Sequence, residues 1–129
     1  MKLLLDTHVF LWSATDPGRL RSEARKALES GIHEAVVSAV TAWEIAIKQS
    51  LGKLDLAKPA EEWVPDVLRR TGFESASVDM SIALRVRSLP WHHRDPFDRL
   101  LIAQALEGGY TVVTRDDVFV KYGIGVLLA

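Results

Sequence analysis

Cysteine is absent from this chain of 129 residues. Its absence excludes disulfide bonds, thiolate metal sites and a cysteine nucleophile, and it fits a reducing compartment such as the cytoplasm. No apolar run approaches the roughly 20 residues that a membrane-spanning helix needs. The apolar stretch after Met1 and Lys2 is three leucines long, too short for a signal peptide. We therefore expect a cytoplasmic protein with no membrane partner.

An excess of positive charge is missing as well. Lys and Arg number 16 against 17 Asp and Glu, which gives a formal net charge of −1. A broad basic surface of the kind that binds nucleic acid is therefore not expected, but short local clusters remain. These clusters are Arg69 with Arg70, Arg85 with Arg87, and His92, His93 and Arg94 with Arg99.

Short apolar runs rich in β-forming residues alternate along the chain with patterns typical of helices, which predicts an α/β fold with a mainly parallel sheet of four to five strands. The runs predict strands near 3–5, 35–37, 73–78, 110–113 and 125–128. Helical spacing and glycine stops predict helices near 8–13, 21–30, 39–51, 59–71, 80–88 and 96–107. Pro65 is expected to kink or split the fourth helix. With no repeat or linker, residues 1–129 are interpreted as one domain.

Four acids follow the predicted strands closely. Asp6 comes directly after the first strand, and Asp116 follows the strand near 110–113 by two residues. Glu44 lies in the helix after the strand near 35–37, and Asp98 opens the helix that leads back to the sheet. Ligands of open α/β sheets bind outside the carboxyl ends of the strands, so these acids are expected to converge there.

The segment DPFDRLLIAQA (95–105) contains two acids at the start of one predicted helix. Asp95 followed by Pro96 is typical of an N-cap with proline in the first helical position. Asp98 instead heads the core-facing stripe of the helix, formed with Leu101, Ile102 and Ala105. Glu44 shares a stripe with apolar residues in the same way. Two acids on core-facing stripes need a common explanation, because a buried charge requires a partner.

Each acid also has a purely structural interpretation. Asp6 and either Asp116 or Asp117 are candidate helix caps, and Asp98 is favoured in a first turn by the helix dipole. Glu44 fits a capping box with Thr41, and Lys48 one turn later is a favourable ion-pair partner.

A carboxylate cluster takes up protons or binds a cation, because like charges about 6 Å apart repel by roughly 3 kcal/mol at an effective dielectric of 20. Oxygen ligands without thiols favour Mg²⁺ or Mn²⁺ over zinc, and such a site suits phosphodiester hydrolysis. The hydroxyls of Thr7, Ser38 and Thr114 stand at the same strand ends, where they either orient water or phosphate or satisfy backbone groups. An imidazole metal site is disfavoured, because no second histidine pair stands at ligand spacing.

Four segments together resemble the PIN-domain ribonucleases, specifically the VapC-type toxins of bacterial toxin–antitoxin pairs. They are LLLDTHVFLW, SAVTAWEIAIKQSLGKL, HRDPFDRLLIAQA and TVVTRDDVF, and the resemblance extends from residue 2 to about residue 127. It implies an α/β/α sandwich, and a Mg²⁺- or Mn²⁺-dependent endoribonuclease that cuts RNA of the tRNA or rRNA class. It also implies a homodimer and inhibition by a cognate antitoxin.

Carried onto this chain, the resemblance assigns the metal site and the catalytic role to Asp6, Glu44, Asp98 and Asp116. Asp95 and Asp117 lie beside two of these positions and remain alternatives to them. We expect Arg94 and Arg99 to hold the RNA backbone, because a nearly neutral protein must concentrate positive charge locally.

Two other functions stay open at this point. One is a receiver-like or phosphoryl-transfer domain that uses Asp6. The other is a non-catalytic, partner-binding domain in which the acids are only caps.

Overall fold

The core of the protein is a five-stranded, fully parallel sheet with the strand order β3-β2-β1-β4-β5. The computed structural model describes all residues from 1 to 129. The strands are β1 (Lys2–Leu5), β2 (Glu34–Ser38), β3 (Glu74–Ala76), β4 (Thr111–Thr114) and β5 (Val126–Leu128). Leu4 in the central strand pairs with Val36 of β2 and Val112 of β4. Each predicted strand is therefore confirmed, as is the α/β class.

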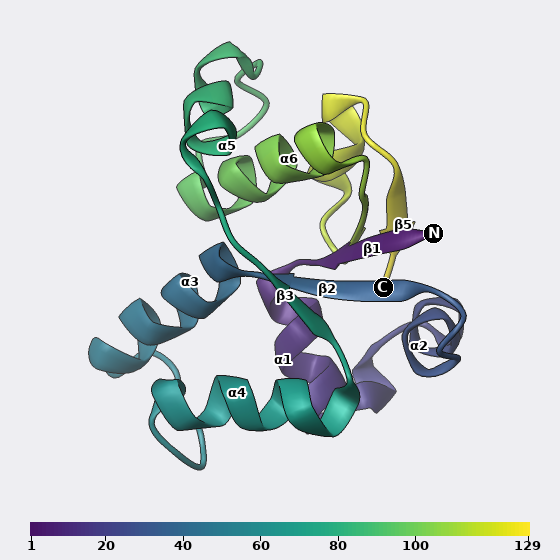
Figure 1. Cartoon of the computed structure of the whole chain (residues 1–129), viewed down its shortest axis with the longest axis vertical. Coiled ribbons are helices and arrows are strands. Elements are labelled where there is room, and N and C mark those ends of the chain that lie inside the picture. Colours follow the sequence, from purple (N-terminus) through teal and green to yellow (C-terminus); the bar gives the residue numbers. More distant parts are fainter.

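Helices cover both faces of the sheet (Figure 1). They are α1 (Thr7–Thr15), α2 (Ser22–Glu29), α3 (Ala39–Ser50), α4 (Ala60–Thr71), α5 (Met80–Arg85) and α6 (Pro96–Gly108). Three short 3-10 helices complete the fold: η1 (Pro17–Arg19), η2 (Val86–Ser88) and η3 (Asp117–Tyr122). The helix predicted near 80–88 is thus divided into α5 and η2. None of the helices is long and apolar enough to cross a membrane.

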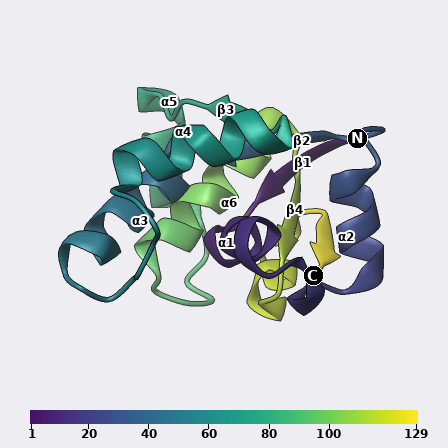
Figure 2. The ribbon, with the colours of Figure 1, turned by 90° about the horizontal axis from the view of Figure 1, so that it is seen from below.

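Alternating strand residues build the two halves of the core. Leu3 and Leu5 of β1 face α1, α2 and α4, whereas Leu4 between them faces α6 on the other side. Helices α1, α2 and α4 lie on the lower side of the sheet in Figure 1 and come to the front when the molecule is viewed from below (Figure 2). Because both faces of the central strands are buried, β1, β2 and β4 consist of nearly continuous apolar runs rather than alternating ones.

Of the two expectations for Pro65, a kink or a split of the fourth helix, the split is wrong. Helix α4 runs unbroken from Ala60 to Thr71, with Pro65 on its exposed side. Proline removes one backbone hydrogen bond, while the opposite side of the helix buries Trp63, Val64 and Val67. Packing of that apolar face holds the helix together, and Gly72 ends it in the left-handed conformation.

Candidate active site

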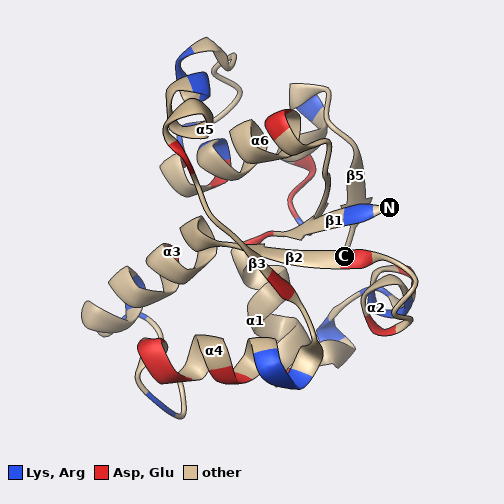
Figure 3. Cartoon of the chain, in the orientation of Figure 1, with Lys and Arg blue, Asp and Glu red and all other residues tan.

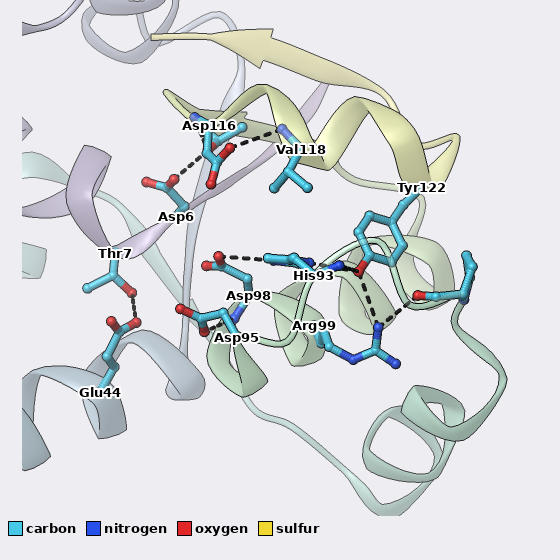
Figure 4. Close-up of polar contacts among 12 residues, drawn as sticks. Asp6, Thr7, Glu44, His93, Asp95, Asp98, Arg99, Asp116, Val118 and Tyr122 are labelled. Atoms are coloured by element: carbon cyan, nitrogen blue, oxygen red, sulfur yellow. Dashed lines mark hydrogen bonds and ion pairs between the residues drawn. The ribbon is translucent and has the colours of Figure 1, made fainter.

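The carboxyl ends of three adjacent strands carry the acidic residues singled out in the sequence. Since β2, β1 and β4 are neighbours, the segments that leave them meet at one edge of the sheet. Asp6 follows β1, helix α3 with Glu44 follows β2, and Asp116 follows β4. The first turn of α6 brings Asp98 to the same place, so that these carboxylates surround a common space (Figure 4).

Asp6 is almost completely buried, with an exposed fraction of 5%. Its Oδ1 accepts a hydrogen bond of 2.8 Å from the Val9 backbone N–H, which confirms that Asp6 caps α1. Its Oδ2 accepts a hydrogen bond from the Thr114 hydroxyl. Burial raises the pKa of Asp6 above its ordinary value, against the lowering effect of these hydrogen bonds.

Glu44 is buried on α3 and has two partners. The Thr7 hydroxyl donates a 2.7 Å hydrogen bond to Oε1, and the Lys48 ammonium pairs with Oε2. The Glu44–Lys48 pair of the sequence interpretation is therefore confirmed, but the capping box is wrong. Helix α3 begins one turn earlier than a cap at Thr41 requires, because Ser38 is the N-cap and its hydroxyl accepts from the Val40 N–H at 3.1 Å.

The two acids of α6 have different roles. Asp95 caps the helix as predicted, accepting a 3.0 Å hydrogen bond from the Asp98 backbone N–H. Burial, together with the negative charges of Asp95, Asp6, Glu44 and Asp116, raises the pKa of Asp98 from 3.8 to about 8. Asp98 is therefore the carboxyl whose ionisation is opposed by all of these neighbouring acids.

Asp116 lies at the open side of the group and is exposed. Its Oδ1 accepts a 3.0 Å hydrogen bond from the Val118 N–H and so caps η3, while its own N–H donates to the Thr114 hydroxyl at 3.0 Å. Thr114 thereby links β4, Asp6 and Asp116. The neighbouring Asp117 is exposed in the first turn of η3 and is not among the charges that raise the Asp98 pKa.

All three hydroxyls singled out in the sequence are buried and already engaged. Thr7 donates to Glu44, Ser38 caps α3, and Thr114 donates to Asp6. Of their two interpretations, the structure favours the supporting one: they hold the acids and the helix starts in place.

The prediction that Arg99 contacts RNA is wrong, because the side chain is 2% exposed. Its guanidinium donates to the backbone carbonyls of Pro90, Leu89 and Val86 and stacks 3.7 Å from the centre of the Trp91 ring. Arg94 is exposed and remains available for a ligand. Other Lys and Arg residues are distributed over α2, α4, α5 and the loops rather than gathered in one broad cluster (Figure 3).

The sequence interpretation did not place two residues beside the acids: His93, which it grouped only with basic residues, and Tyr122. His93 places Nε2 3.2 Å from Asp98 Oδ2, and its Nδ1 lies 2.7 Å from the Tyr122 hydroxyl (Figure 4). His93 stands five positions before Asp98, but Tyr122 is 29 positions from His93 and has no sequence signal that points to it.

The four acids Asp6, Glu44, Asp98 and Asp116 form a group that is chemically suited to a cation, although their side chains are spread apart in this structure. No three acidic or histidine groups lie close enough together to hold a single ion as they stand. Asp98 Oδ1 and Asp116 Oδ2 face the common space without a hydrogen-bond donor, and Lys48 is the cation paired with the group through Glu44. Oxygen-only donors and unrelieved negative charge fit a hard divalent ion such as Mg²⁺ or Mn²⁺.

Comparison with known proteins places this arrangement in a family. The PIN domain model matches residues 3–125 of the chain. Ribonuclease VapC22 of Mycobacterium tuberculosis is 32% identical over 115 residues, which cover 88% of this chain and 86% of VapC22.

Solved structures share the fold at low sequence identity. The crystal structure of VapBC2 from Rickettsia felis, bound to a DNA fragment from its promoter, matches with a TM-score of 0.73 at 13% identity, covering 99% of this chain and 98% of that chain. FitAcB from Neisseria gonorrhoeae matches with a TM-score of 0.60 at 21% identity, covering 97% and 96%. The chain therefore belongs to the PIN domain family, of which it is a VapC-type member.

Proposed function

We propose that this protein is a divalent-metal-dependent endoribonuclease and acts as the toxin of a toxin–antitoxin pair. The observation that carries the proposal is the electrostatic state of Asp98, whose pKa is raised to about 8 by burial and by four other carboxylates. A carboxyl that is surrounded by other carboxylates is stabilised most, in its ionised form, by a bound cation. The name of the relative VapC22, a ribonuclease, supports RNA as the substrate.

Asp6, Glu44, Asp98 and Asp116 are the proposed ligands of Mg²⁺ or Mn²⁺. When bound there, a divalent ion neutralises the scissile phosphate and lowers the pKa of the attacking water. The chain itself supplies rigidity, because Thr114 and the start of α1 hold Asp6, while Thr7 and Lys48 hold Glu44. Asp98 and Asp116 each keep one oxygen free of a donor and are the proposed mobile side of the site.

The remaining assignments extend this proposal. Arg94, exposed at the loop before α6, is the proposed contact for the RNA backbone. The substrate is proposed to be of the tRNA or rRNA class, in the cytoplasm. A cognate antitoxin is supported by the VapBC2 and FitAcB assemblies, and a homodimer is proposed from family resemblance.

The alternative functions have less support in the geometry. A receiver-like role in which Asp6 is phosphorylated requires room for a phosphoryl group at its carboxylate, but Asp6 is buried and both of its oxygens accept hydrogen bonds. A purely structural role explains Asp6 and Asp116 as caps, but Asp98 caps nothing and its ionisation is disfavoured where it stands.

RNA cleavage by the purified protein tests the proposal. We expect cleavage of single-stranded RNA with Mg²⁺ or Mn²⁺, none in EDTA, and at least a hundredfold loss in Asp98→Asn and Asp116→Asn, because each removes a proposed ligand (the loss is roughly that of one strong transition-state interaction). Asp117→Asn is the matched control, since it removes a neighbouring acid outside the group. Cleavage that persists in chelator, or equal losses in Asp116→Asn and Asp117→Asn, contradicts the proposal.

A further inference from the structure

A chain of polar groups connects buried Arg99 to Asp98. Arg99 Nη1 lies 3.2 Å from the Tyr122 hydroxyl, which lies 2.7 Å from His93 Nδ1, and His93 Nε2 lies 3.2 Å from Asp98 Oδ2. All four side chains are drawn in Figure 4. They come from α6, η3 and the loop before α6, so the connection exists only in the folded protein.

The direction of each hydrogen bond follows from the chemistry of the end groups. A guanidinium can only donate, so the Tyr122 oxygen accepts from Arg99. The Tyr122 oxygen accepts a second hydrogen bond from the His93 backbone N–H, so its single proton is left to donate to His93 Nδ1, which is then the unprotonated ring nitrogen. Nε2 therefore carries the hydrogen and donates it to Asp98 Oδ2.

The Arg99 end of this chain is fixed firmly. Its guanidinium donates to the carbonyls of Pro90 at 2.8 Å and of Leu89 and Val86 at 3.4 Å, and Trp91 covers its face. These contacts tie the segment that leads to His93 onto α6. The Tyr122 hydroxyl is also 3.3 Å from the His93 backbone N–H, which sets the position of the ring as well as its protonation.

We propose that His93 is a positioning residue of the nuclease site: Tyr122 and Arg99 hold it in the Nε2–H tautomer, and its N–H orients the Asp98 carboxylate toward Asp6, Glu44 and Asp116. The inference rests on the function proposed above. Asp98 Oδ2 is occupied by His93, so that Oδ1 is turned to the common space as the oxygen offered to a cation. Groups that orient the ligands of a metal in this way typically change affinity or activity by about 10–100-fold when they are lost.

The tautomer can be measured without substrate or metal. Protonated and unprotonated imidazole nitrogens differ strongly in ¹⁵N chemical shift, so NMR of ¹⁵N-histidine-labelled protein reports it directly. For the neutral imidazole of the metal-free protein, we expect the His93 proton to lie on Nε2 alone, and Tyr122→Phe to shift the population toward Nδ1–H. A proton on Nδ1 in the wild-type protein overturns the inference.

Paired substitutions of His93 test its effect on the reaction. A glutamine amide reaches about as far as Nε2, whereas an asparagine amide reaches only about as far as Nδ1. We expect His93→Asn and Tyr122→Phe to lower kcat by about 10–100-fold with little change in KM for RNA, and His93→Gln to recover much of the loss. His92→Gln is the control, because His92 contacts the Tyr122 ring and makes no hydrogen bond to Asp98.

The outcomes separate this inference from the proposed function. Equal kcat values in His93→Asn and His93→Gln, with both variants folded by circular dichroism, contradict the positioning role while wild-type cleavage stands. If wild-type protein fails to cut RNA, the proposed function fails, and the NMR measurement still decides whether His93 is held in the Nε2–H form.

Discussion

Thr7, the first residue of α1, donates a 2.7 Å hydrogen bond to Glu44 on α3. Both side chains are buried, so the bond fixes the carboxylate in a place where water cannot replace the donor. The residue that follows Asp6 in sequence thereby holds a second acid of the site in position.

Replacing this hydroxyl is expected to destabilise the protein. Thr7→Val keeps the shape but leaves Glu44 Oε1 without its donor, and we expect the free energy of unfolding to fall by ~1–3 kcal/mol. Thr7→Ser keeps the hydroxyl and is the matched control. Urea denaturation of the three proteins checks this, and a Val variant as stable as the Ser variant contradicts it.

Asp98→Asn is expected to stabilise the metal-free protein by roughly 1–2 kcal/mol, because it removes a carboxyl whose ionisation is opposed by burial and by neighbouring charges. Glu44→Gln is expected to differ, since it leaves Lys48 without its partner, and should be neutral or destabilising.

Mn²⁺ at a hundred times its dissociation constant should stabilise wild type by ~2.7 kcal/mol and the variants less. Thermal melts in EDTA and in Mn²⁺ decide between this and the capping interpretation, which predicts loss of stability in Asp98→Asn and no response to the ion.

The raised pKa of Asp98 also predicts how metal-free stability depends on pH. The folded state holds the Asp98 proton up to a pKa of about 8, whereas the unfolded chain loses it near the ordinary value of 3.8. The contribution of Asp98 is thus fully present below the ordinary pKa and is lost as the pH rises through about 8. In EDTA, wild type should therefore lose more stability than Asp98→Asn between about pH 5 and about pH 9. If the free energies of unfolding of the two proteins change with pH in parallel, the prediction is wrong.

Most of the fold follows from the sequence because its signals are local. Strands such as 3–5 are short apolar runs between turns, and Asp95 with Pro96 marks the start of α6 without reference to the rest of the chain. The four acids could be grouped because parallel strands end at a common edge. The connection from Tyr122 to His93, by contrast, joins segments 29 residues apart through contacts of the Tyr122 hydroxyl. Arg99 was misplaced because three of its four hydrogen-bond partners are backbone carbonyls, which carry no sequence signature.

Arg94 and Arg99 should respond to substitution in opposite ways. Arg94→Ala removes an exposed charge, so we expect near-unchanged stability and weaker RNA binding, with a salt dependence reduced by about one charge. Arg99→Ala removes the guanidinium that donates to Tyr122 and to three backbone carbonyls, and should cost roughly 3 kcal/mol or more of folding free energy. Denaturation and RNA titrations at several salt concentrations check both. An RNA affinity of Arg94→Ala equal to that of wild type at low salt contradicts the contact.

The location of a bound ion tests the central claim most directly. Crystals grown or soaked with Mn²⁺ reveal the ion by its anomalous scattering, independently of any activity. We predict a peak between Asp98 and Asp116 at the carboxyl ends of β1 and β4, with carboxylate oxygens of this group within about 2.0–2.6 Å, the range of hard divalent ions. No peak there at saturating Mn²⁺, or peaks only at other surface carboxylates, contradicts the account.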